Sequence, residues 1–563
     1  MKEKIDYYFV GILLLFLTVS NLLLSSLCWL LGFTINSLLF PLSFLITIVL
    51  IGIKKRSTKD VLYYTFLIAT LLFISILINS FIMDISCDGQ LYHQPGVYAL
   101  SHDWNPIYNS QNSVISNEWA SNIWIEHYCK GMETISACIV AFTGNLESGK
   151  AINLILLVSL FFIIYDFLSL NFNKYLNNKK IILYSCLLTF SPTMVGQLFT
   201  YYIDLCGYYS FLVLAILLYR LIVQNDNFTY LPLACCIVLA GAVKYNMFFW
   251  SAYLIFISIL YLLFCKRYFE GIKIAVFSLI IAVFTIFIID YNPFVTNYID
   301  HNNPIYPMGS SEIDGTAIVT KNCQPIYMQN ESRFLQVLQS IASRPQNDVQ
   351  MTQYVHPYTD VFKSIAKSAG EGPCLGGGGF FFFECILISI LIMFMCRKNK
   401  KFEIALFCYL LLAITPFILP LGSNIRYVPF IYALPILSVL FSEILVCDSF
   451  TLRLLRKLLI VLLLCNITLS TAMTLLKQGI KQLTWTYYID SIKKHPNETT
   501  YIGKNWSLNY KVKGENTEPI LMNKDSLFTP HKYFADPYTK INREILDKEV
   551  AQRNFIGKHI AKQ

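Results

Sequence analysis

The sequence has few charged residues and lacks the compact motifs of several enzyme classes. Only 14% of its 563 residues are charged, 55% are hydrophobic, and the mean hydropathy is +0.52, whereas a typical soluble domain carries about 25% charged residues. It has no Walker loop, G-x-S-x-G or H-E-x-x-H motif, and its 16 cysteines include no C-x-x-C metal spacing. These absences exclude an ordinary soluble domain and leave nucleotide-driven pumping and metalloprotease chemistry unsupported.

Apolar stretches long enough to cross a bilayer recur along most of the chain. A transmembrane helix needs about 17–25 predominantly apolar residues. The sequence therefore predicts an all-α integral membrane protein. Thirteen crossings are expected, at residues 7–30, 36–53, 61–83, 151–170, 181–197, 205–223, 231–247, 249–265, 272–290, 380–396, 402–420, 427–446 and 457–477.

Basic residues are concentrated in short turns between these spans, as is typical of cytoplasmic loops. The apolar segment 133–144 is too short to cross, and we interpret it as an interfacial or re-entrant helix. With this segment excluded, all the basic turns fall on one side, which we predict to be cytoplasmic. These turns are 54–60, 174–180, 266–267, 397–401 and 452–457. They account for much of the net charge of +9, and no nucleic-acid partner is predicted.

Three polar regions fall on the opposite side of the predicted membrane. They are a loop at 84–150, a loop at 291–379 and a tail at 479–563. The second loop contains the glycine run Gly376–Gly379, which lacks the lysine of a phosphate-binding loop. We expect this run to let a helix begin close to its neighbours, because glycine has no side chain.

The first outer loop begins with two carboxylates and an imidazole directly after a span. Asp84 and Asp88 are followed by Tyr92 and His93, and Lys130 lies further along the loop. A carboxylate at this place could deprotonate an acceptor or bind a metal ion. The alternative is a helix cap, because an aspartate at a helix start binds unpaired backbone amides and complements the helix dipole.

Three further charged residues lie where predicted spans meet the outer side. Asp204 lies between two spans, Lys244 interrupts the apolar run of the seventh span, and Arg426 begins the twelfth. Ionised side chains that border hydrocarbon are costly and often functional, and arginine suits phosphate oxygens. The alternatives are a helix cap for Asp204, extension to the surface for Lys244 and an interfacial anchor for Arg426.

These residues belong to short motifs that resemble those of the GT-C membrane glycosyltransferases. The resemblance lies in the order of the motifs along the chain and in their position on one side of the predicted membrane. The motifs are Asp88 with Tyr92-His93, Trp104-Asn105-Pro106, His127-Tyr-Cys-Lys130-Gly, Thr200-Tyr-Tyr-Ile-Asp204, Gly241-Ala-Val-Lys244-Tyr and Arg426-Tyr. The resemblance covers roughly residues 61–446 and implies a GT-C-like multi-span helical bundle with extracytoplasmic loops. It divides the chain into two N-terminal transmembrane helices (1–60), a transmembrane catalytic module with the two outer loops (61–446), a last transmembrane helix (447–478) and a small extracytoplasmic tail domain (479–563).

The resemblance also implies roles for the candidate residues. Members of this family typically use a polyprenyl-phosphate-linked sugar as donor, and an aspartate of the first outer loop lies near the acceptor. Asp88 is then the expected base, with Asp204 as a supporting carboxylate and Lys244 and Arg426 as contacts of the donor phosphate. The remaining candidates for substrate binding are Asp84, Tyr92, His93 and Lys130. The family often has adjacent acidic residues in this loop, whereas Asp84 and Asp88 are four positions apart, so either carboxylate could be the base.

The expected activity is transfer of a sugar from a polyprenyl-phosphate carrier to an extracytoplasmic glycan, lipid or protein acceptor. We expect a role in surface polysaccharide or glycoconjugate synthesis, in a bacterial inner membrane with the active site facing outside. No cofactor or metal ligand is predicted, and a requirement for a divalent cation stays open. The alternatives are a polysaccharide polymerase or ligase, a lipid-linked sugar flippase or transporter, and a noncatalytic assembly subunit. A transporter is expected to carry polar groups at the bilayer midplane, whereas here they gather at one face.

Overall fold

The computed structural model describes most of the chain as helices. It covers residues 5–111, 114–115, 122–309, 324–345, 351–367, 375–399, 401–419, 421–447, 449–494 and 510–511. No β-strand occurs within these ranges, which confirms the predicted all-α class. Most of the predicted tail, residues 495–509 and 512–563, lies outside the described residues, as do Lys400 and parts of both predicted outer loops.

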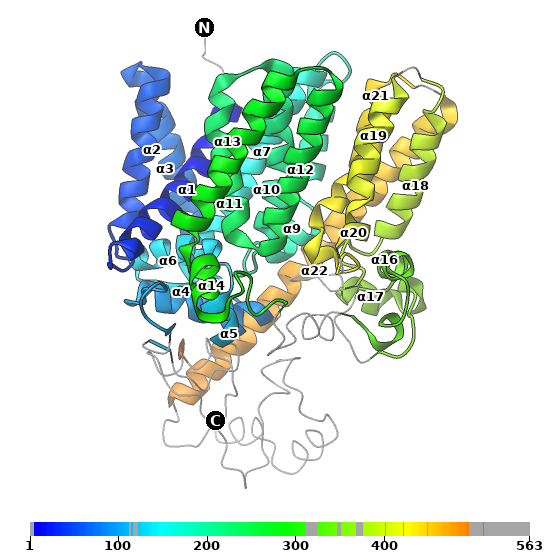
Figure 1. Ribbon diagram of the computed structural model, residues 1–563. Coiled ribbons are helices and arrows are strands. Elements are labelled where there is room, and N and C mark those ends of the chain that lie inside the picture. Colours follow the sequence, from blue (N-terminus) through cyan, green and yellow to red (C-terminus); the bar gives the residue numbers. More distant parts are fainter. Residues whose placement is uncertain are drawn as a thin grey trace, which may run out of the picture.

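Figure 1 shows long helices standing side by side, with short helices gathered at one end of the bundle. The helices of the bundle are α1 (Tyr7–Leu30), α2 (Leu39–Lys55), α3 (Thr58–Ser80), α7 (Ala151–Phe172), α8 (Asn178–Thr189), α9 (Pro192–Gln197), α10 (Asp204–Tyr219), α11 (Tyr230–Val243), α12 (Tyr245–Phe264), α13 (Tyr268–Phe284), α18 (Phe382–Met395), α19 (Phe402–Ala413), α20 (Thr415–Ile418), α21 (Ala433–Ile444) and α22 (Phe450–Lys494). The short helices are α4 (Gln94–Ser101), α5 (Asn122–His127), α6 (Gly131–Thr143), α14 (Thr296–His301), α16 (Arg333–Ala342) and α17 (Val361–Lys367). We call the end of the bundle that carries these short helices the loop end.

Seven helical segments of the described chain are long and apolar enough to cross a bilayer. They are Tyr7–Leu30, Thr58–Ser80, Leu146–Phe172, Asp204–Gln224, Tyr245–Phe264, Tyr268–Ile289 and Phe450–Tyr487. Large apolar side chains on several of them face outward, such as Phe66 on α3 and Leu279 on α13. Because extensive apolar surface of this kind is unfavourable in water, the chain is a multi-pass integral membrane protein. The other predicted crossings correspond to shorter helices and stay predictions.

Prolines interrupt three of the predicted spans. Proline has no backbone N–H and is disfavoured in a helix interior. Pro192 begins α9 after α8 has ended, Pro416 lies in the short α20 after α19, and Pro429 precedes the start of α21 at Ala433. Three predicted spans are therefore each divided into shorter helical pieces. These spans are 181–197, 402–420 and 427–446.

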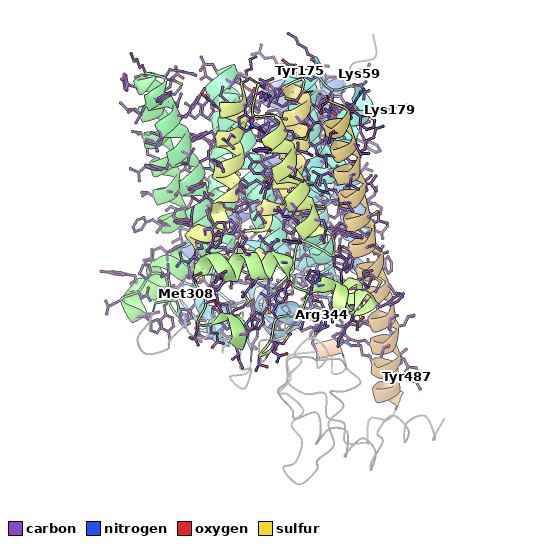
Figure 2. The ribbon with its side chains drawn as sticks, turned by 90° about the vertical axis from the view of Figure 1, so that its right-hand side faces the viewer. Lys59, Tyr175, Lys179, Met308, Arg344 and Tyr487 are labelled. Carbon is purple, nitrogen blue, oxygen red and sulfur yellow. The ribbon has the colours of Figure 1, made fainter. Side chains whose placement is uncertain are left out.

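The basic turns lie at the end of the bundle opposite the loop end. Figure 2 shows Lys59, Tyr175 and Lys179 at one end and Met308 and Arg344 at the other. The basic turns therefore lie at one end of the bundle and the long loops at the other, as the charge pattern predicts. Which end faces the cytoplasm stays a prediction.

Helix α6 begins and ends at the loop end, as expected for a segment too short to cross. After α6, the side chain of Asn145 donates to the carbonyl of Ser80 at the end of α3 (3.3 Å), and Lys150 Nζ donates to Ile82 O (2.7 Å). The chain thus leaves α3 and enters α7 at the same end. This confirms that the segment 133–144 does not cross the bundle.

Helix α1 lies in the interior of the bundle and packs closely against α7. A Cβ at Gly11 would lie only 2.6 Å from Ile163 Cγ1 and 3.0 Å from the carbonyl oxygen of Ser159. The hydroxyl of Ser159 donates to Gly11 O (2.7 Å). Small residues at such crossings allow two helix backbones to approach in a membrane, where interhelical hydrogen bonds then add to the packing.

Helix α22 continues beyond the predicted last span and reaches the first outer loop. Its Gln478 donates to Met83 O (2.6 Å), which places the extension beside the end of α3. Further back in α22, the amide of Asn466 donates to Gly378 O (2.7 Å), and a Cβ at Gly379 (φ +96°) would overlap the Asn466 side chain. The glycine run therefore allows the close approach that the sequence predicts.

Candidate functional site

Four charged side chains from distant parts of the chain meet at the loop end. They are Asp88 from the first outer loop, Asp204 at the start of α10, Lys244 between α11 and α12, and Arg426 from the short helix η10 (Ile425–Tyr427). Arg426 is 338 positions from Asp88 and 222 from Asp204 in the sequence, yet it contacts both carboxylates. We call these four residues the charge network.

Asp204 is the buried centre of the charge network. Its side chain is 0% exposed. One carboxylate oxygen accepts from Lys244 Nζ (2.8 Å), and the other accepts from Arg426 Nε (3.0 Å) and Gln197 Nε2 (2.9 Å). Gln197 Oε1 in turn accepts from the backbone N–H of Leu205, which holds the first turn of α10. Asp204 therefore has a donor on each of its oxygens and fixes the position of both cations.

Lys244 lies at a break between two helices. Its backbone is extended (φ −164°, ψ 138°), so α11 ends before it and α12 begins after it. The side chain is 8% exposed, and its ammonium lies 4.3 Å from the ring centre of Tyr427. A charge buried to this degree requires an anionic partner, and Asp204 supplies it. Lys244 thus pairs with Asp204 inside the protein and does not extend to the surface.

Arg426 connects the two carboxylates of the charge network. Its Nη2 donates to Asp88 Oδ2 (2.8 Å) while its Nε donates to Asp204 Oδ2 (3.0 Å). The guanidinium lies 4.5 Å from the ring centre of Tyr202, and the side chain is 18% exposed. The local turn is stabilised by Asn424, whose side-chain oxygen accepts from the backbone N–H of Arg426 (3.1 Å).

Asp88 is the more accessible carboxylate of the charge network. Its side chain is 21% exposed, compared with 0% for Asp204. Among the described residues, the ion pair with Arg426 is the one contact of its carboxylate. The backbone N–H of Asp88 donates to the hydroxyl of Tyr202 (3.4 Å), a residue that also stacks with Arg426. Asp88 is thus placed to meet a molecule that enters from the loop end.

Asp84 lies apart from the charge network, in a buried site of its own. Its carboxylate accepts from the backbone N–H groups of Ser86 (2.7 Å) and Tyr201 (2.8 Å), and its side chain is buried. Burial raises the pKa of the Asp84 carboxyl above its usual range, although the nearby Lys150 lowers it. The position of Asp84 favours a structural role, since it joins the first loop to the segment before α10.

The surroundings of Asp84 include a second group of buried charges. Glu147 accepts from the backbone N–H of Asp84 (2.9 Å) and forms ion pairs with Lys150 and Lys511. Lys150 is completely buried, and Lys511 comes from the described part of the tail. Sequence reasoning did not identify this group, because the four residues show no common motif.

His93 and Lys130 also lie outside the charge network. The imidazole of His93 pairs with Glu133, and Lys130 Nζ donates to the carbonyl of Tyr128 (2.9 Å). Burial lowers the pKa of the Lys130 ammonium to about 8. Lys130 and Glu133 line a small pocket together with Tyr92 and other aromatic side chains of the first loop.

Tyr92 lies between this pocket and the charge network. Its ring packs on His93 with 4.3 Å between ring centres. Burial raises the pKa of the Tyr92 phenol, and the negative charge of Asp88 raises it further, while Arg426 lowers it. The structure therefore brings Asp88, Asp204, Lys244 and Arg426 together, places Tyr92 beside them, and leaves the remaining predicted residues in separate contacts.

Sequence reasoning missed Gln197, Tyr202 and Tyr427 as parts of the site. Gln197 holds Asp204, and the two tyrosine rings cover the cations. Each of them stands in or beside a motif that contains a predicted residue, so proximity in sequence was an available signal.

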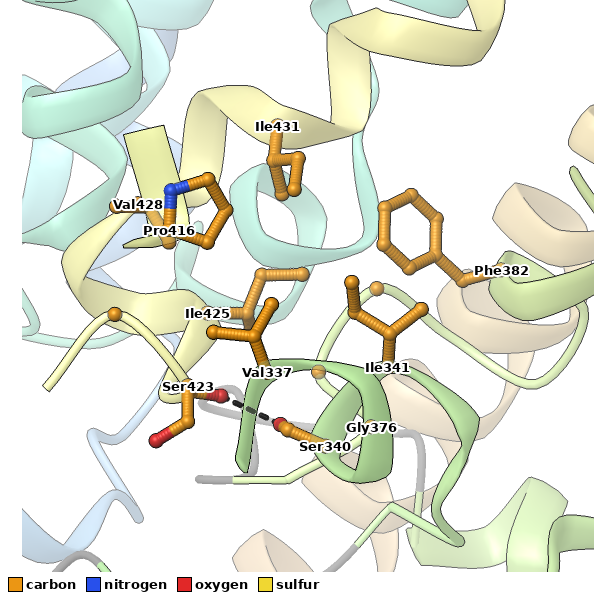
Figure 3. Close-up of a pocket in the computed structure, with 13 residues that line it drawn as sticks. Val337, Ser340, Ile341, Gly376, Phe382, Pro416, Ser423, Ile425, Val428 and Ile431 are labelled. Atoms are coloured by element: carbon orange, nitrogen blue, oxygen red, sulfur yellow. Dashed lines mark hydrogen bonds between the residues drawn. The ribbon is translucent and has the colours of Figure 1, made fainter. Parts of the chain in front are cut away.

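A small apolar pocket lies directly beside the segment that carries Arg426. Figure 3 shows Val337 and Ile341 of α16 facing Ile425 and Ile431, with Phe382 at one side. The hydroxyl of α16 residue Ser340 donates to the carbonyl of Ser423, the dashed line in Figure 3. Because Ile425 lines the pocket and its neighbour Arg426 contacts the carboxylates, apolar and charged surfaces meet at η10.

Within the described ranges, no group of three His, Cys, Asp or Glu side chains is arranged as a metal site. Both carboxylates of the charge network contact protein cations.

Comparison of the chain with protein-family models, curated proteins and solved structures gave no match in any of the three. A function is therefore inferred from the geometry of the site and from the motifs in the sequence.

Proposed function

We propose that this membrane protein is a glycosyltransferase that moves a sugar from a polyprenyl-phosphate carrier to a glycan, lipid or protein acceptor at the loop end. The observation that carries this proposal is the charge network, in which the accessible carboxylate of Asp88 pairs with Arg426, and the buried carboxylate of Asp204 holds both Arg426 and Lys244. The same residues carry the resemblance to the GT-C glycosyltransferases. We infer a bacterial inner membrane as the location, with the loop end facing outside and a role in cell-envelope polysaccharide or glycoconjugate synthesis.

The surroundings of the charge network support a lipid-linked donor. A polyprenyl phosphate presents its phosphate at the headgroup level and its hydrocarbon within the bilayer. Arg426 offers a cation at the loop end of the bundle. Arginine recognises phosphate oxygens through its planar set of donors. A phosphate at the headgroup level would therefore lie within reach of this cation.

In the proposed reaction, Asp88 acts as the general base. It takes the proton of an acceptor hydroxyl, and the acceptor oxygen forms a bond to the anomeric carbon of the donor sugar. The bond between that carbon and the phosphate oxygen breaks at the same time, and the electron pair stays on the phosphate. Lys244 and Arg426 stabilise the negative charge that develops there. One base and one displacement invert the configuration at the anomeric carbon, without a covalent enzyme intermediate.

Asp204 is suited to a positioning role in this reaction. Three donors from Lys244, Arg426 and Gln197 occupy its carboxylate, and its side chain is fully buried. Because both of its oxygens already accept from these donors, the carboxylate is poorly placed to take an acceptor proton. It holds the two cations where the phosphate is expected to bind.

The test is turnover of radiolabelled polyprenyl-phosphate sugars by the purified protein in lipid vesicles. We expect sugar release from one donor of a panel, and we expect Asp88→Asn to abolish it, because the amide has nearly the same shape but cannot accept the proton. Asp103→Asn is the matched control. Asp103 belongs to the same outer loop but accepts from Thr34 at an exposed position (3.1 Å), so its change should leave turnover intact.

A fully active Asp88→Asn protein would remove Asp88 from the role of base. Failure of the folded wild type to turn over any donor would argue against the transferase. A second assay then tests the alternative of a lipid-linked sugar flippase. It measures movement of an intact fluorescent lipid-linked sugar between the two leaflets.

A further inference from the structure

Arg426 forms ion pairs with two carboxylates of the charge network, and these two pairs differ in burial. Its Nε contacts the fully buried Asp204, which Lys244 and Gln197 also hold. Its Nη2 contacts Asp88, whose side chain is 21% exposed and whose carboxylate has this one partner among the described residues. Partly exposed ion pairs are weak, whereas breaking a buried pair leaves an uncompensated charge. A competing anion should therefore displace Asp88 from Arg426 before it displaces Asp204.

The charges of the network indicate why such a displacement would be needed. Two carboxylates and two cations balance each other when all four are ionised. A phosphate that approaches Arg426 adds a negative charge next to the carboxylate of Asp88, and like charges at this distance repel. The phosphate and Asp88 thus compete for the same face of the guanidinium.

We propose that Arg426 is a donor-operated switch for the base. Without donor, Nη2 of Arg426 holds the Asp88 carboxylate in an ion pair, so that its oxygen is engaged by the guanidinium. When the donor binds, its phosphate takes the place of Asp88 at Nη2, while Nε remains on Asp204. The released Asp88 carboxylate then accepts the acceptor proton. This inference depends on the proposed function. It adds an order of events to the reaction, because the donor must bind before the acceptor is activated.

The test measures binding of sugar-free polyprenyl phosphate, which carries the phosphate but cannot react. We expect Asp88→Asn to bind this lipid more tightly than the wild type, by up to about fivefold, because the neutral amide no longer competes for Arg426. Asp88→Ala, which removes the carboxylate altogether, should also tighten binding. Asp103→Asn should bind as the wild type does. Thermal unfolding of each variant in the same lipid establishes that it is folded.

The result for Asp88 separates this inference from the proposed function. Folded Asp88→Asn and Asp88→Ala proteins that bind polyprenyl phosphate no more tightly than the wild type would overturn the switch. If Asp88→Asn also abolishes sugar transfer in that case, the transferase assignment stands without the switch. A wild-type protein that neither binds polyprenyl phosphate nor turns over a donor overturns both.

Discussion

Replacing Asp204 with asparagine should destabilise the protein far more than the same replacement of Asp88. Both changes remove one negative charge from the charge network and keep the shape of the side chain. The two carboxylates differ in burial and in the number of their donors. Asp204 is 0% exposed and contacts Lys244, Arg426 and Gln197, whereas Asp88 is 21% exposed and contacts Arg426.

The expected magnitudes follow from this difference. Removing one partner of a buried ion pair costs about 3–5 kcal/mol, because the remaining charge is left without compensation. The remaining charge here is Lys244, whose side chain is 8% exposed. A partly exposed pair contributes about 0–1 kcal/mol, so Asp88→Asn should cost about 1 kcal/mol or less. Adding Lys244→Met to Asp204→Asn should recover part of the loss, since the stranded ammonium is then gone.

A suitable assay is thermal unfolding in detergent, followed with a thiol-reactive dye. Cys206 in α10 and Cys236 in α11 are buried and become reactive when the surrounding helices separate. Asp103→Asn serves as the control for a charge change in an exposed loop. Equal unfolding temperatures for Asp204→Asn and Asp88→Asn would refute the assignment of Asp204 as a buried, charge-compensating centre.

Three further predictions concern the first outer loop and the tail residue that contacts it. Gly89→Ala should reduce the yield of folded protein, because a Cβ at this position would overlap the Asp84 carboxylate. Lys130 should make stability depend on alkaline pH: the unfolded chain holds its proton up to about pH 10.4, whereas burial lowers the pKa of the folded-state ammonium to about 8. The free energy of unfolding should therefore rise with pH between these two values, and Lys130→Met should remove that rise in thermal unfolding measured across the range. Lys511→Ala should lower the unfolding temperature, because the buried Glu147 loses one of its two cationic partners.

Each of these predictions has an outcome that would contradict it, and the glycine substitution also has a control within the chain. Gly52→Ala in α2 should fold normally, because a Cβ at Gly52 would meet no atom of the described residues within 4 Å and alanine favours helix; equal yields for both glycine variants would contradict the steric argument. A pH dependence that persists in Lys130→Met would assign the effect to another group. An unchanged unfolding temperature for Lys511→Ala would mean that Lys150 alone compensates Glu147.

The lengths of the helical pieces were only partly predictable. Hydropathy identified the apolar segments, because the requirement to cross hydrocarbon depends on local composition. It did not locate the breaks at Pro192 and Pro416, which divide apolar runs without changing their hydropathy. Nor did it predict that α22 would continue to Lys494, since a polar helix can be stabilised by contacts such as Gln478 with Met83.

The sequence by itself determined the helical class, the separation of basic turns from long loops, and a short set of charged candidates at one face. These are consequences of composition and periodicity, which act over a few residues. Only the tertiary structure decided which candidates meet. Asp84 and Asp88 are four positions apart, yet the first accepts backbone N–H groups in a closed site and the second contacts Arg426, 338 positions away. A contact between residues so far apart in the sequence depends on how the helices pack, and no local pattern in a single sequence encodes it.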